Sequence, residues 1–252
     1  MGRLDGHVAL ITGGNSGIGL GMATGLARAG ADVAIWGTSA GKNEIAAAQL
    51  SELGVRVHAE ICDVADEQAQ EVSFARTVEA LGKVDSVFAN AGTNGGMATI
   101  TDMSLEEWRR LMSVNLDGVF LTLRAGARHL VERGEGGSLI AVSSTSAIHG
   151  SPYQPHYGAA KAGLLGLVRS AAVALARHQV RVNAVLPGWT DTPMASGGKS
   201  NEKFMAATLG RTPVRRWADP SEFAEVAVFL ADPALTFHTG DTLVVDGGYT
   251  VF

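Results

Sequence analysis

Two residues in the second half of the chain, Tyr157 and Lys161, have types and a spacing that suit proton transfer. They lie in the segment YQPHYGAAKAG, residues 153–163. Pro155 favours the first turn of a helix, so the tyrosine and the lysine four residues later share one helical face. A nearby ammonium group favours the tyrosinate and lowers the pKa of a phenol. We therefore expect Tyr157 to protonate a carbonyl oxygen or to deprotonate an alcohol, although the pair alone could also be an ordinary surface pair.

The segment TGGNSGIG, residues 12–19, suits the binding of a dinucleotide. It follows a short apolar run and leads straight into a helical segment. Glycines allow a tight turn and let backbone N–H groups approach a pyrophosphate, which then lies at the positive end of the helix. Gly19 would also let the helix pack close to the strand. The spacing Gly13-x-x-x-Gly17-x-Gly19 differs from G-x-G-x-x-G, and an ordinary glycine-rich turn is the alternative interpretation.

The segment after the second apolar run bears on the choice of cofactor. In NAD-binding folds an acidic residue about 20 positions after the glycines usually binds the ribose hydroxyls. Residues 35–39 read IWGTS and contain no carboxylate. Thr38, Ser39 and Lys42 could accept a 2′-phosphate, although no arginine stands there and Asn15 is not basic. The segment therefore favours NADP(H) slightly over NAD(H).

Short apolar runs alternate with helical patterns and must position these residues. The runs lack polar alternation, as do parallel strands that are covered on both faces. We predict an α/β fold in three layers, with a Rossmann-type, doubly wound, parallel seven-stranded sheet and helices on both faces. Residues 1–252 would form a single dinucleotide-binding oxidoreductase domain. The expected strands are 7–12, 32–36, 55–60, 84–89, 137–142, 180–186 and 242–245.

Helix signals fill the gaps between these runs. Asp66 suits an N-cap, and Ser104 followed by Glu107 is typical of a capping box that opens a long helix. A third helical pattern covers residues 155–178. The stretch 187–219, rich in Gly, Pro, Ser and Thr, is expected to be irregular and to act as a lid over the substrate.

Composition argues against several classes of protein. The net charge of −5 gives no basic footprint for nucleic acid. The sole cysteine, Cys62, rules out an internal disulfide and fits a reducing compartment, and the seven histidines show no metal spacing. No apolar run approaches the ~20 residues of a membrane span. We therefore expect a cytoplasmic protein without a metal or a membrane partner.

Several ordered motifs together resemble the classical short-chain dehydrogenase/reductase family. The resemblance covers essentially the whole chain. Within the family, the chain is similar to members of the 3-oxoacyl-[acyl-carrier-protein] reductase type and of the sugar or steroid dehydrogenase type. Each motif is weak alone, but the ordered set is hard to produce by chance. The motifs are TGGNSGIG at 12–19, CDV at 62–64, NAG at 90–92, VNLDG at 114–118, SS at 143–144, Tyr157-x-x-x-Lys161, VNAVLPG at 182–188 and TGDTLVVDGG at 239–248.

The resemblance implies a catalytic set of Asn115, Ser144, Tyr157 and Lys161. The family serine stands 13 residues before the tyrosine, which selects Ser144 over Ser143 and Ser146 and would let it hold the substrate carbonyl. Tyr157 would be the general acid or base, and Lys161 would tune it and bind the nicotinamide ribose. Asn115 would anchor a water near Lys161, whereas read without the family it could be a hydrogen-bonded core residue.

The resemblance also implies how the cofactor and the substrate are held. Asp63 would contact the adenine, Asn90 the adenosine ribose, and the segment after the sixth strand the nicotinamide. The full expected cofactor set is Thr12, Gly13, Asn15, Ser16, Gly17, Ile18, Gly19, Thr38, Asp63, Val64, Asn90, Ala91, Gly92, Tyr157, Lys161, Pro187, Gly188, Thr190 and Thr192. The expected substrate set is Ser144, Ser146, Tyr153 and Trp189, with Ile148 and Met194 also lining the pocket; His149 is either a polar contact or simply an exposed loop residue.

The sequence thus predicts an NAD(P)(H)-dependent oxidoreductase that transfers hydride between a nicotinamide cofactor and a ketone or secondary alcohol. A sugar-derived ketone, a 3-oxoacyl thioester and a hydroxysteroid remain open as substrates. One alternative is a non-catalytic dinucleotide-binding sensor or scaffold. Another is an epimerase or dehydratase, whose usual extra lobe a chain of 252 residues hardly permits. By resemblance we also expect a homotetramer, or a dimer, built through the long helices and the C-terminal strand.

Overall fold

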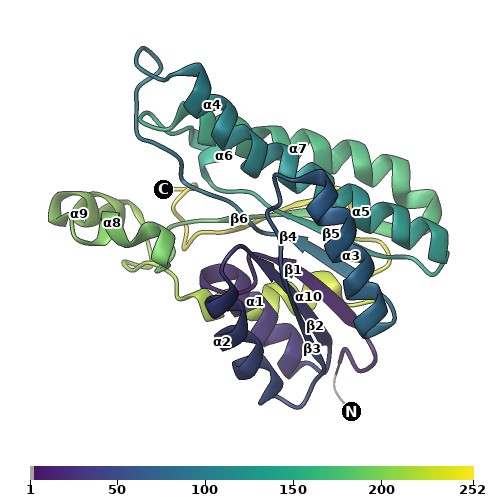
Figure 1. Cartoon of the computed structure of the whole chain (residues 1–252). Helices are drawn as coiled ribbons and strands as arrows, with labels where there is room; N and C mark the ends of the chain where they lie inside the picture. Colours follow the sequence, from purple (N-terminus) through teal and green to yellow (C-terminus); the bar gives the residue numbers. More distant parts are fainter. Residues whose placement is uncertain (1–2) are drawn as a thin grey trace.

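The computed structural model describes residues 3–252 and has one sheet of seven parallel strands at its centre (Figure 1). The strand order is β3-β2-β1-β4-β5-β6-β7, so the chain reverses its direction of winding between β1 and β4. This confirms the predicted doubly wound fold. The strands are β1 (Val8–Thr12), β2 (Asp32–Gly37), β3 (Val57–Ile61), β4 (Ser86–Ala89), β5 (Gly137–Val142), β6 (Val180–Pro187) and β7 (Thr242–Val245).

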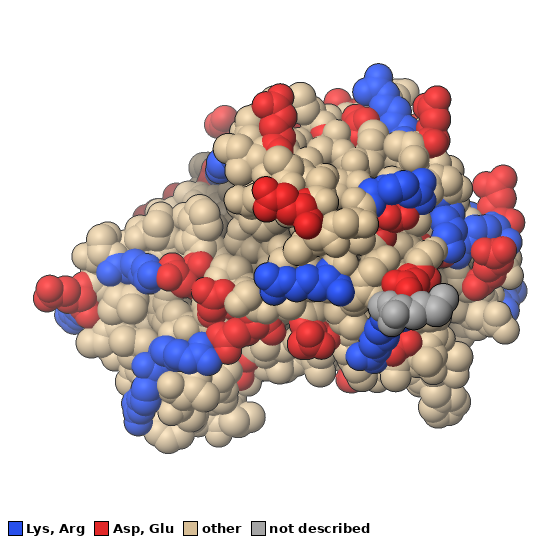
Figure 2. Space-filling model, turned by 90° about the horizontal axis from the view of Figure 1, so that it is seen from below, with Lys and Arg blue, Asp and Glu red and all other residues tan. Residues whose placement is uncertain are grey.

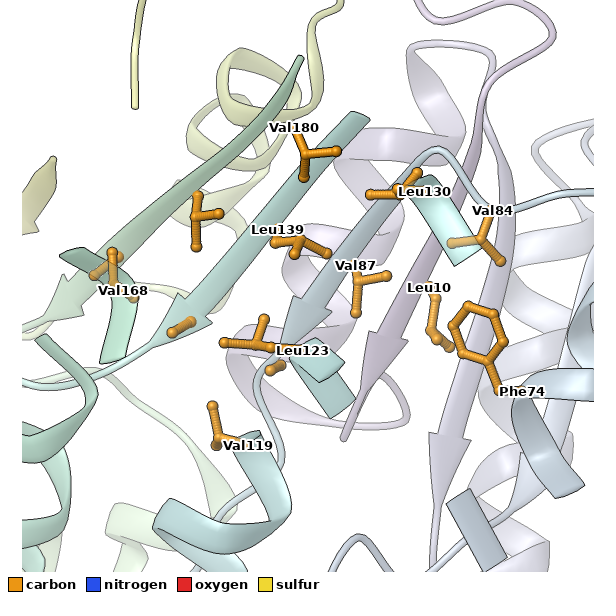
Figure 3. Packing of buried hydrophobic residues seen from close by; sticks show 14 of the residues in the cluster. Leu10, Phe74, Val84, Val87, Val119, Leu123, Leu130, Leu139, Val168 and Val180 are labelled. Atoms are coloured by element: carbon orange, nitrogen blue, oxygen red, sulfur yellow. The ribbon is translucent and has the colours of Figure 1, made fainter. Parts of the chain in front are cut away.

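Both faces of the sheet are buried, which explains why the strand sequences are apolar without alternation. Successive side chains on a strand point to opposite faces. Leu10 accordingly packs into one hydrophobic core, together with Val87 and Leu139 of the neighbouring strands (Figure 3). The next residue on β1, Ile11, packs into the second core on the other face.

Helices cover the two faces in sets (Figure 1). One face carries α1 (Gly17–Arg28), α2 (Ala40–Ser51) and α10 (Ala224–Ala231), which follows the short 3-10 turn Pro220–Phe223. The other carries α3 (Glu67–Leu81), α5 (Gly118–Arg133) and α7 (Pro155–Leu175), which ends in the 3-10 turn Ala176–His178. Asp66 caps its helix as expected by accepting a hydrogen bond from the Ala69 N–H. Ser104 accepts one from the Glu107 N–H, but the Glu107 carboxylate binds Arg110 instead of completing the expected capping box.

The long helix expected after Ser104 is interrupted. It consists of α4 (Leu105–Met112), a π-helical turn over Ser113–Asp117, and α5. A π turn widens the helix by one residue and is frequent at functional sites. It contains Asn115, whose side chain is fully buried.

The stretch 187–219 is more ordered than expected. It contains a 3-10 turn (Pro193–Ala195), α8 (Ser196–Lys199) and α9 (Glu202–Arg211), and these helices stand out from the body in Figure 1. The expectation of an irregular segment was therefore wrong for its middle part, residues 193–211. Asn201 caps α9 by accepting a hydrogen bond from the Phe204 N–H, a local signal that the Gly- and Ser-rich surroundings obscure.

The helical segment Pro155–His178 is long and apolar enough to cross a membrane by length and composition. The expectation that no segment approaches this limit was therefore wrong. The segment nevertheless belongs to the fold, because α7 packs on β6 and buries Lys161, Leu164 and Val168. Only 28% of its most apolar window is buried, so an apolar face remains exposed.

Candidate functional site

Many of the predicted site residues lie at the carboxyl ends of four adjacent strands. Residues 12–19 follow or end β1, 90–92 follow β4, 143–146 follow β5, and 187–192 end or follow β6. Helices leave β1 and β4 toward opposite faces of the sheet. In open α/β sheets ligands bind at this reversal, outside the carboxyl ends of the strands.

The glycine-rich turn is held rigidly between β1, β2 and β4. The Gly13 N–H donates to the Trp36 carbonyl at 2.7 Å. The Thr12 hydroxyl accepts from the N–H groups of Asn90 (3.1 Å) and Ala91 (3.0 Å), and the Asn90 side-chain amide donates to the Thr12 carbonyl (3.0 Å). Thr12 and Asn90 thus join two strand ends as well as bordering the expected cofactor site.

The start of α1 has the features that an anion requires. Gly13 and Gly17 have φ of 65° and 53°, values that glycine adopts without strain. A Cβ on Gly19 would lie 2.2 Å from the Gly13 carbonyl oxygen, so the helix begins in close contact with the turn. Within residues 3–252, the Ser16 side chain accepts no capping hydrogen bond and the first turn of α1 has no acidic residue. The N–H groups of this turn, including that of Ile18, therefore suit a pyrophosphate.

Other expected cofactor residues border the same turn. The Thr192 side chain lies beside Gly17, since a Cβ there would come within 3.2 Å of its methyl carbon. Pro187 and Thr190 are buried, and the Thr190 hydroxyl donates to the Gly188 carbonyl at 3.1 Å. The segments after β1 and β6, which are distant in sequence, therefore meet.

Two side-chain amides, and no carboxylate from residues 35–39, lie at the end of β2. The Asn15 side chain donates to Asn43 Oδ1 at 2.7 Å, and Asn43 donates to the carbonyls of Gly37 (3.0 Å) and Glu60 (2.9 Å). A Cβ on Gly37 would lie 2.2 Å from Asn15 Nδ2, so a larger residue there would displace the Asn15 side chain. Thr38 is exposed beside this network. Sequence reasoning missed Asn43, which only its burial identifies.

The expected adenine-binding residues lie after β3. Asp63 is exposed, and its carboxylate accepts a hydrogen bond from the Ala65 N–H at 2.9 Å. Val64 is buried, and its carbonyl accepts from Gln70 Nε2 at 2.6 Å. Gln70 also donates to the Gly118 carbonyl at 3.1 Å, which ties this segment to α5.

The tyrosine, serine and lysine converge between β5 and α7. The Ser144 side chain accepts a hydrogen bond from the Ser146 N–H at 3.1 Å and lies close enough to the Tyr157 phenol to lower its pKa. The Lys161 ammonium donates to the carbonyl of Val142, the last residue of β5, at 2.8 Å and lies 5.7 Å from the centre of the Tyr157 ring. The neighbouring Ser143 is buried and donates to the Lys161 carbonyl at 2.7 Å. Ser143 therefore anchors α7, whereas Ser144 faces the tyrosine.

Burial governs the charges of this group. It raises the pKa of the Tyr157 phenol, although the nearby Ser144 hydroxyl acts in the opposite direction. Burial also lowers the pKa of Lys161 to about 8. The expectation that the lysine brings the phenol pKa below its ordinary value was therefore wrong in direction, because removal from water disfavours the tyrosinate more than its surroundings favour it.

Both the oxygen and the nitrogen of the Asn115 side-chain amide form hydrogen bonds. Its Oδ1 accepts from the Thr93 N–H and its Nδ2 donates to the Thr93 carbonyl, both at 2.8 Å. A Cβ on Gly92 would lie 3.2 Å from Asn115 Oδ1 and 3.7 Å from Lys161 Nζ. Asn115 thus fixes the backbone after β4 close to the lysine.

The expected substrate residues differ in their surroundings. Ser146 is half-buried in α6 (Ser146–His149), while Ile148 and Tyr153 are exposed. Trp189 stacks on Trp217 at 5.5 Å and meets Phe204 of α9 edge-on at 5.0 Å, so it also anchors the expected lid. The exposed His149 packs against Tyr249.

Four residues that sequence reasoning did not assign to the site surround it. The Asn94 side chain donates to the Met194 carbonyl at 2.7 Å, and Gln154 Nε2 donates to the Asn94 carbonyl at 2.7 Å. His156, next to Tyr157, is fully buried and lies 3.4 Å from Glu107. For Gln154 and His156 the available signal was proximity to Tyr157 in the sequence. Asn94 and Glu107 gave no site signal, because the loop that brings these residues together has no periodic pattern.

A hollow of about 400 Å³ lies at the opposite, amino-terminal edge of the sheet, and His7, Asp85, Arg133 and Arg181 line it. None of the predicted site residues contributes to it. The face shown in Figure 2 mixes Lys and Arg with Asp and Glu, so its described residues form no continuous basic surface of the kind that binds nucleic acid.

Comparisons with known proteins agree with this geometry. Residues 13–250 match the family described as enoyl-(acyl carrier protein) reductase. The chain is 40% identical over 252 residues to an L-rhamnose 1-dehydrogenase (NAD(P)(+)) of Sphingomonas sp. (strain SKA58), covering 100% of this chain and 99% of the relative. It is 38% identical over 250 residues to an NADP-dependent (R)-specific alcohol dehydrogenase of Lentilactobacillus kefiri, covering 98% of each.

A solved structure of a short-chain type dehydrogenase/reductase from Mycobacterium marinum superposes with a TM-score of 0.92 at 35% identity, covering 98% of this chain and 96% of that one. The match therefore extends over the sheet, the glycine-rich turn and the tyrosine–lysine helix together. The chain belongs to the classical short-chain dehydrogenase/reductase family, and it is an NAD(P)(H)-dependent enzyme acting on CH–OH and C=O groups.

Proposed function

We propose that the enzyme interconverts a ketone and a secondary alcohol with Tyr157 as its general acid and base. The observation that carries this proposal is the position of Tyr157 beside the buried Lys161 and near Ser144, at the same sheet edge as the glycine-rich turn. The non-catalytic alternative gives no reason for a buried ammonium group beside a phenol, since burial of an unpaired charge is costly.

Each side chain then has a defined task. The raised pKa of Tyr157 keeps the phenol protonated at neutral pH, as a proton donor to a carbonyl oxygen must be. Ser144 would hold the same oxygen, and Lys161, with a pKa of about 8, would be largely cationic at neutral pH and favour the tyrosinate left after proton transfer. Asn115 would support Lys161 through the Gly92–Thr93 backbone. When bound, the nicotinamide cofactor supplies or accepts the hydride.

Replacing the phenol tests this assignment. Tyr157→Phe should lower kcat by at least about a hundredfold, because general acid–base catalysis contributes roughly that much or more, while the cofactor dissociation constant stays nearly unchanged. Steady-state turnover with a panel of ketones and alcohols, followed at the reduced-nicotinamide absorbance band, provides the measurement. Tyr249→Phe is the matched control, and it should retain wild-type turnover. Comparable kcat in Tyr157→Phe and the wild type would refute the assignment.

The cofactor would lie along the strand ends with its pyrophosphate at the start of α1. Its adenosine end would face Thr38, Asp63 and the Asn15–Asn43 amides. The absence of a carboxylate at the end of β2 removes repulsion of a 2′-phosphate, and the exposed Lys42 in the first turn of α2 would attract one. These features support a slight preference for NADP(H). The L. kefiri relative is named NADP-dependent and the Sphingomonas relative NAD(P)-dependent.

Cofactor preference is directly measurable. Fluorescence titration with NADH and NADPH should give tighter binding of NADPH, and Lys42→Ala should reduce that difference without weakening NADH. A preference for NADH of more than about tenfold, or ~1.4 kcal/mol, would reverse the assignment.

The substrate would enter between Ser146, Tyr153 and the lid over residues 187–219. The names of the two relatives make L-rhamnose and simple secondary alcohols the first compounds to screen. The 3-oxoacyl thioesters and hydroxysteroids follow. We further propose a cytoplasmic homotetramer, or a dimer, whose contacts would cover the exposed apolar face of α7.

A further inference from the structure

We propose that His156 and Glu107 form a positioning pair that holds the loop of residues 93–98 (the 93–98 loop) against the first turn of α7 and so orients Tyr157. The inference rests on the proposed role of Tyr157 and extends it to two residues that do not touch the reacting atoms.

The hydrogen bonds of His156 define its tautomer. Its ring is fully buried, and its Nδ1 accepts a hydrogen bond from the Tyr157 backbone N–H at 3.0 Å. A neutral imidazole that accepts at Nδ1 carries its proton on Nε2. Nε2 therefore donates toward Glu107 Oε1, which lies 3.4 Å away.

Glu107 is a fixed negative charge at the other end of this contact. Arg110 donates to both of its oxygens, at 2.7 and 2.8 Å, and the Gly96 N–H donates to Oε1. The hydrogen bonds from Arg110 and Gly96 lower the pKa of Glu107 to about 2. The carboxylate therefore stays ionised over the working pH range and links α4, His156 and the loop.

The 93–98 loop lies directly on this pair. Gly95 has a φ of 66°, and a Cβ on it would lie 2.6 Å from His156 Nε2 and 2.6 Å from Leu111 Cδ1. The Ala98 N–H donates to the Tyr153 carbonyl at 2.9 Å. The loop cannot shift without disturbing the residues that precede Tyr157.

The same loop also contacts the π turn, the residues before α7 and the lid. Thr93 is paired with Asn115, and Asn94 receives a hydrogen bond from Gln154 and donates one to Met194 of the lid. Through the loop, the His156–Glu107 pair therefore connects the start of the tyrosine helix to the lid. Loosening this connection would displace Tyr157 from its productive position, and small displacements of a reacting group cost large factors in rate.

Two substitutions at His156 separate positioning from folding. Asn can keep the acceptor for the Tyr157 N–H but cannot reach Glu107, whereas Gln can present a donor to Glu107. His156→Asn should lower kcat per cofactor-binding site by about tenfold, with the cofactor dissociation constant within about twofold of wild type. His156→Gln should recover to within about threefold of the wild-type kcat. A purely structural role would reduce the folded fraction and the Tm but leave kcat per cofactor-binding site unchanged.

Hydrogen–deuterium exchange gives a second measurement that needs no turnover. Amides of the 93–98 loop should exchange faster in His156→Asn than in wild type, while those of residues 8–12 in β1 should not. His178→Asn, the same change at the far end of the α7 segment, is the control. If His156→Asn does not fold, Glu107→Ala is compared with Glu106→Ala, an exposed neighbour on the same turn. Faster exchange confined to the Glu107 variant supports the pair.

The kcat measurements use ethyl acetoacetate as the carbonyl substrate. If the enzyme does not turn this compound over, the hydrogen–deuterium exchange of the 93–98 loop alone tests the inference. Wild-type exchange of the 93–98 loop in both His156→Asn and Glu107→Ala would overturn the inference. A Gln variant as slow as the Asn variant would overturn it too. If Tyr157→Phe is fully active, the proposed function fails instead; if Tyr157→Phe is inactive and His156→Asn turns over normally, only the positioning pair fails.

Discussion

His7 lies half-buried just before β1, where its ring nitrogen Nε2 is 3.0 Å from the Ser86 hydroxyl. Burial lowers its pKa from 6.5 to about 4, and the attraction of Asp85 only partly offsets this. Between pH 7 and pH 5 the unfolded chain takes up a proton at this residue and the folded chain does not. The free energy of unfolding should therefore fall as the pH falls, by about 2 kcal/mol from His7 alone.

Denaturant unfolding at pH 7 and pH 5 measures this difference. In His7→Gln, which retains a side-chain amide for Ser86, the loss of stability between the two pH values should be smaller than in wild type by about 2 kcal/mol. His178→Gln should keep the wild-type dependence. An unchanged pH dependence in His7→Gln would show that the imidazole is protonated in the folded protein.

Some residues of the candidate site could be predicted from the sequence, and others could not. Tyr157 and Lys161 were identified because their types and spacing suit proton transfer, and Ser144 was selected through the resemblance to the family. Asn43, Asn94 and His156 were missed, since an amide or an imidazole gains its role only from the backbone groups that the fold brings to it. Trp189 was assigned to the substrate, yet its main described contacts are Phe204 and Trp217. Spacing along the chain carries no information about such packing.

We expect cofactor binding to depend most on the contact between α1 and the turn before it. A Cβ on Gly19 would lie 2.2 Å from the Gly13 carbonyl oxygen and 2.5 Å from Asn90 Nδ2. Gly19→Ala must therefore move the helix start away from the turn. We expect a loss of stability of about 1–3 kcal/mol and a weakening of cofactor binding by at least about tenfold.

Thermal unfolding and cofactor titration of the same variant test this expectation. Gly166→Ala is the matched control, because Gly166 is an exposed helical residue and a Cβ on it would have no described atom within 4 Å. It should raise stability by about 0.5–1 kcal/mol and leave cofactor binding unchanged. Wild-type cofactor affinity in Gly19→Ala would show that the turn is not part of the binding site.

Strands and long helices followed from the sequence because burial on both faces leaves a continuous apolar run. The expected range 84–89 contains β4 (Ser86–Ala89), and the expected range 137–142 coincides with β5 (Gly137–Val142). The π turn at Ser113–Asp117 and the short helix α9 (Glu202–Arg211) were missed. Both depend on a few local hydrogen bonds, such as the Asn201 cap, rather than on a repeated apolar stripe.

The whole molecule leaves apolar groups exposed along one side of the sheet. Val173 on α7 is 84% exposed, Phe237 before β7 is fully exposed, and Val244 on β7 is 39% exposed. β7 is also the last strand of the sheet, with a neighbour on one side only among the described residues. Open strand edges and exposed apolar faces are typical of surfaces that other chains cover.

We therefore expect a second copy of the chain to pack on α7 and β7. The double variant Val173→Glu, Phe237→Ser should form a smaller assembly than wild type, because a carboxylate at a dry apolar contact is costly to bury. Sedimentation velocity at micromolar concentration measures the change. Ile45→Glu, at an exposed position of α2 on the opposite side of the fold, should leave the assembly intact. A wild-type protein that sediments as a monomer would rule out this interface. An unchanged assembly in the double variant would show that the copies contact one another through another face.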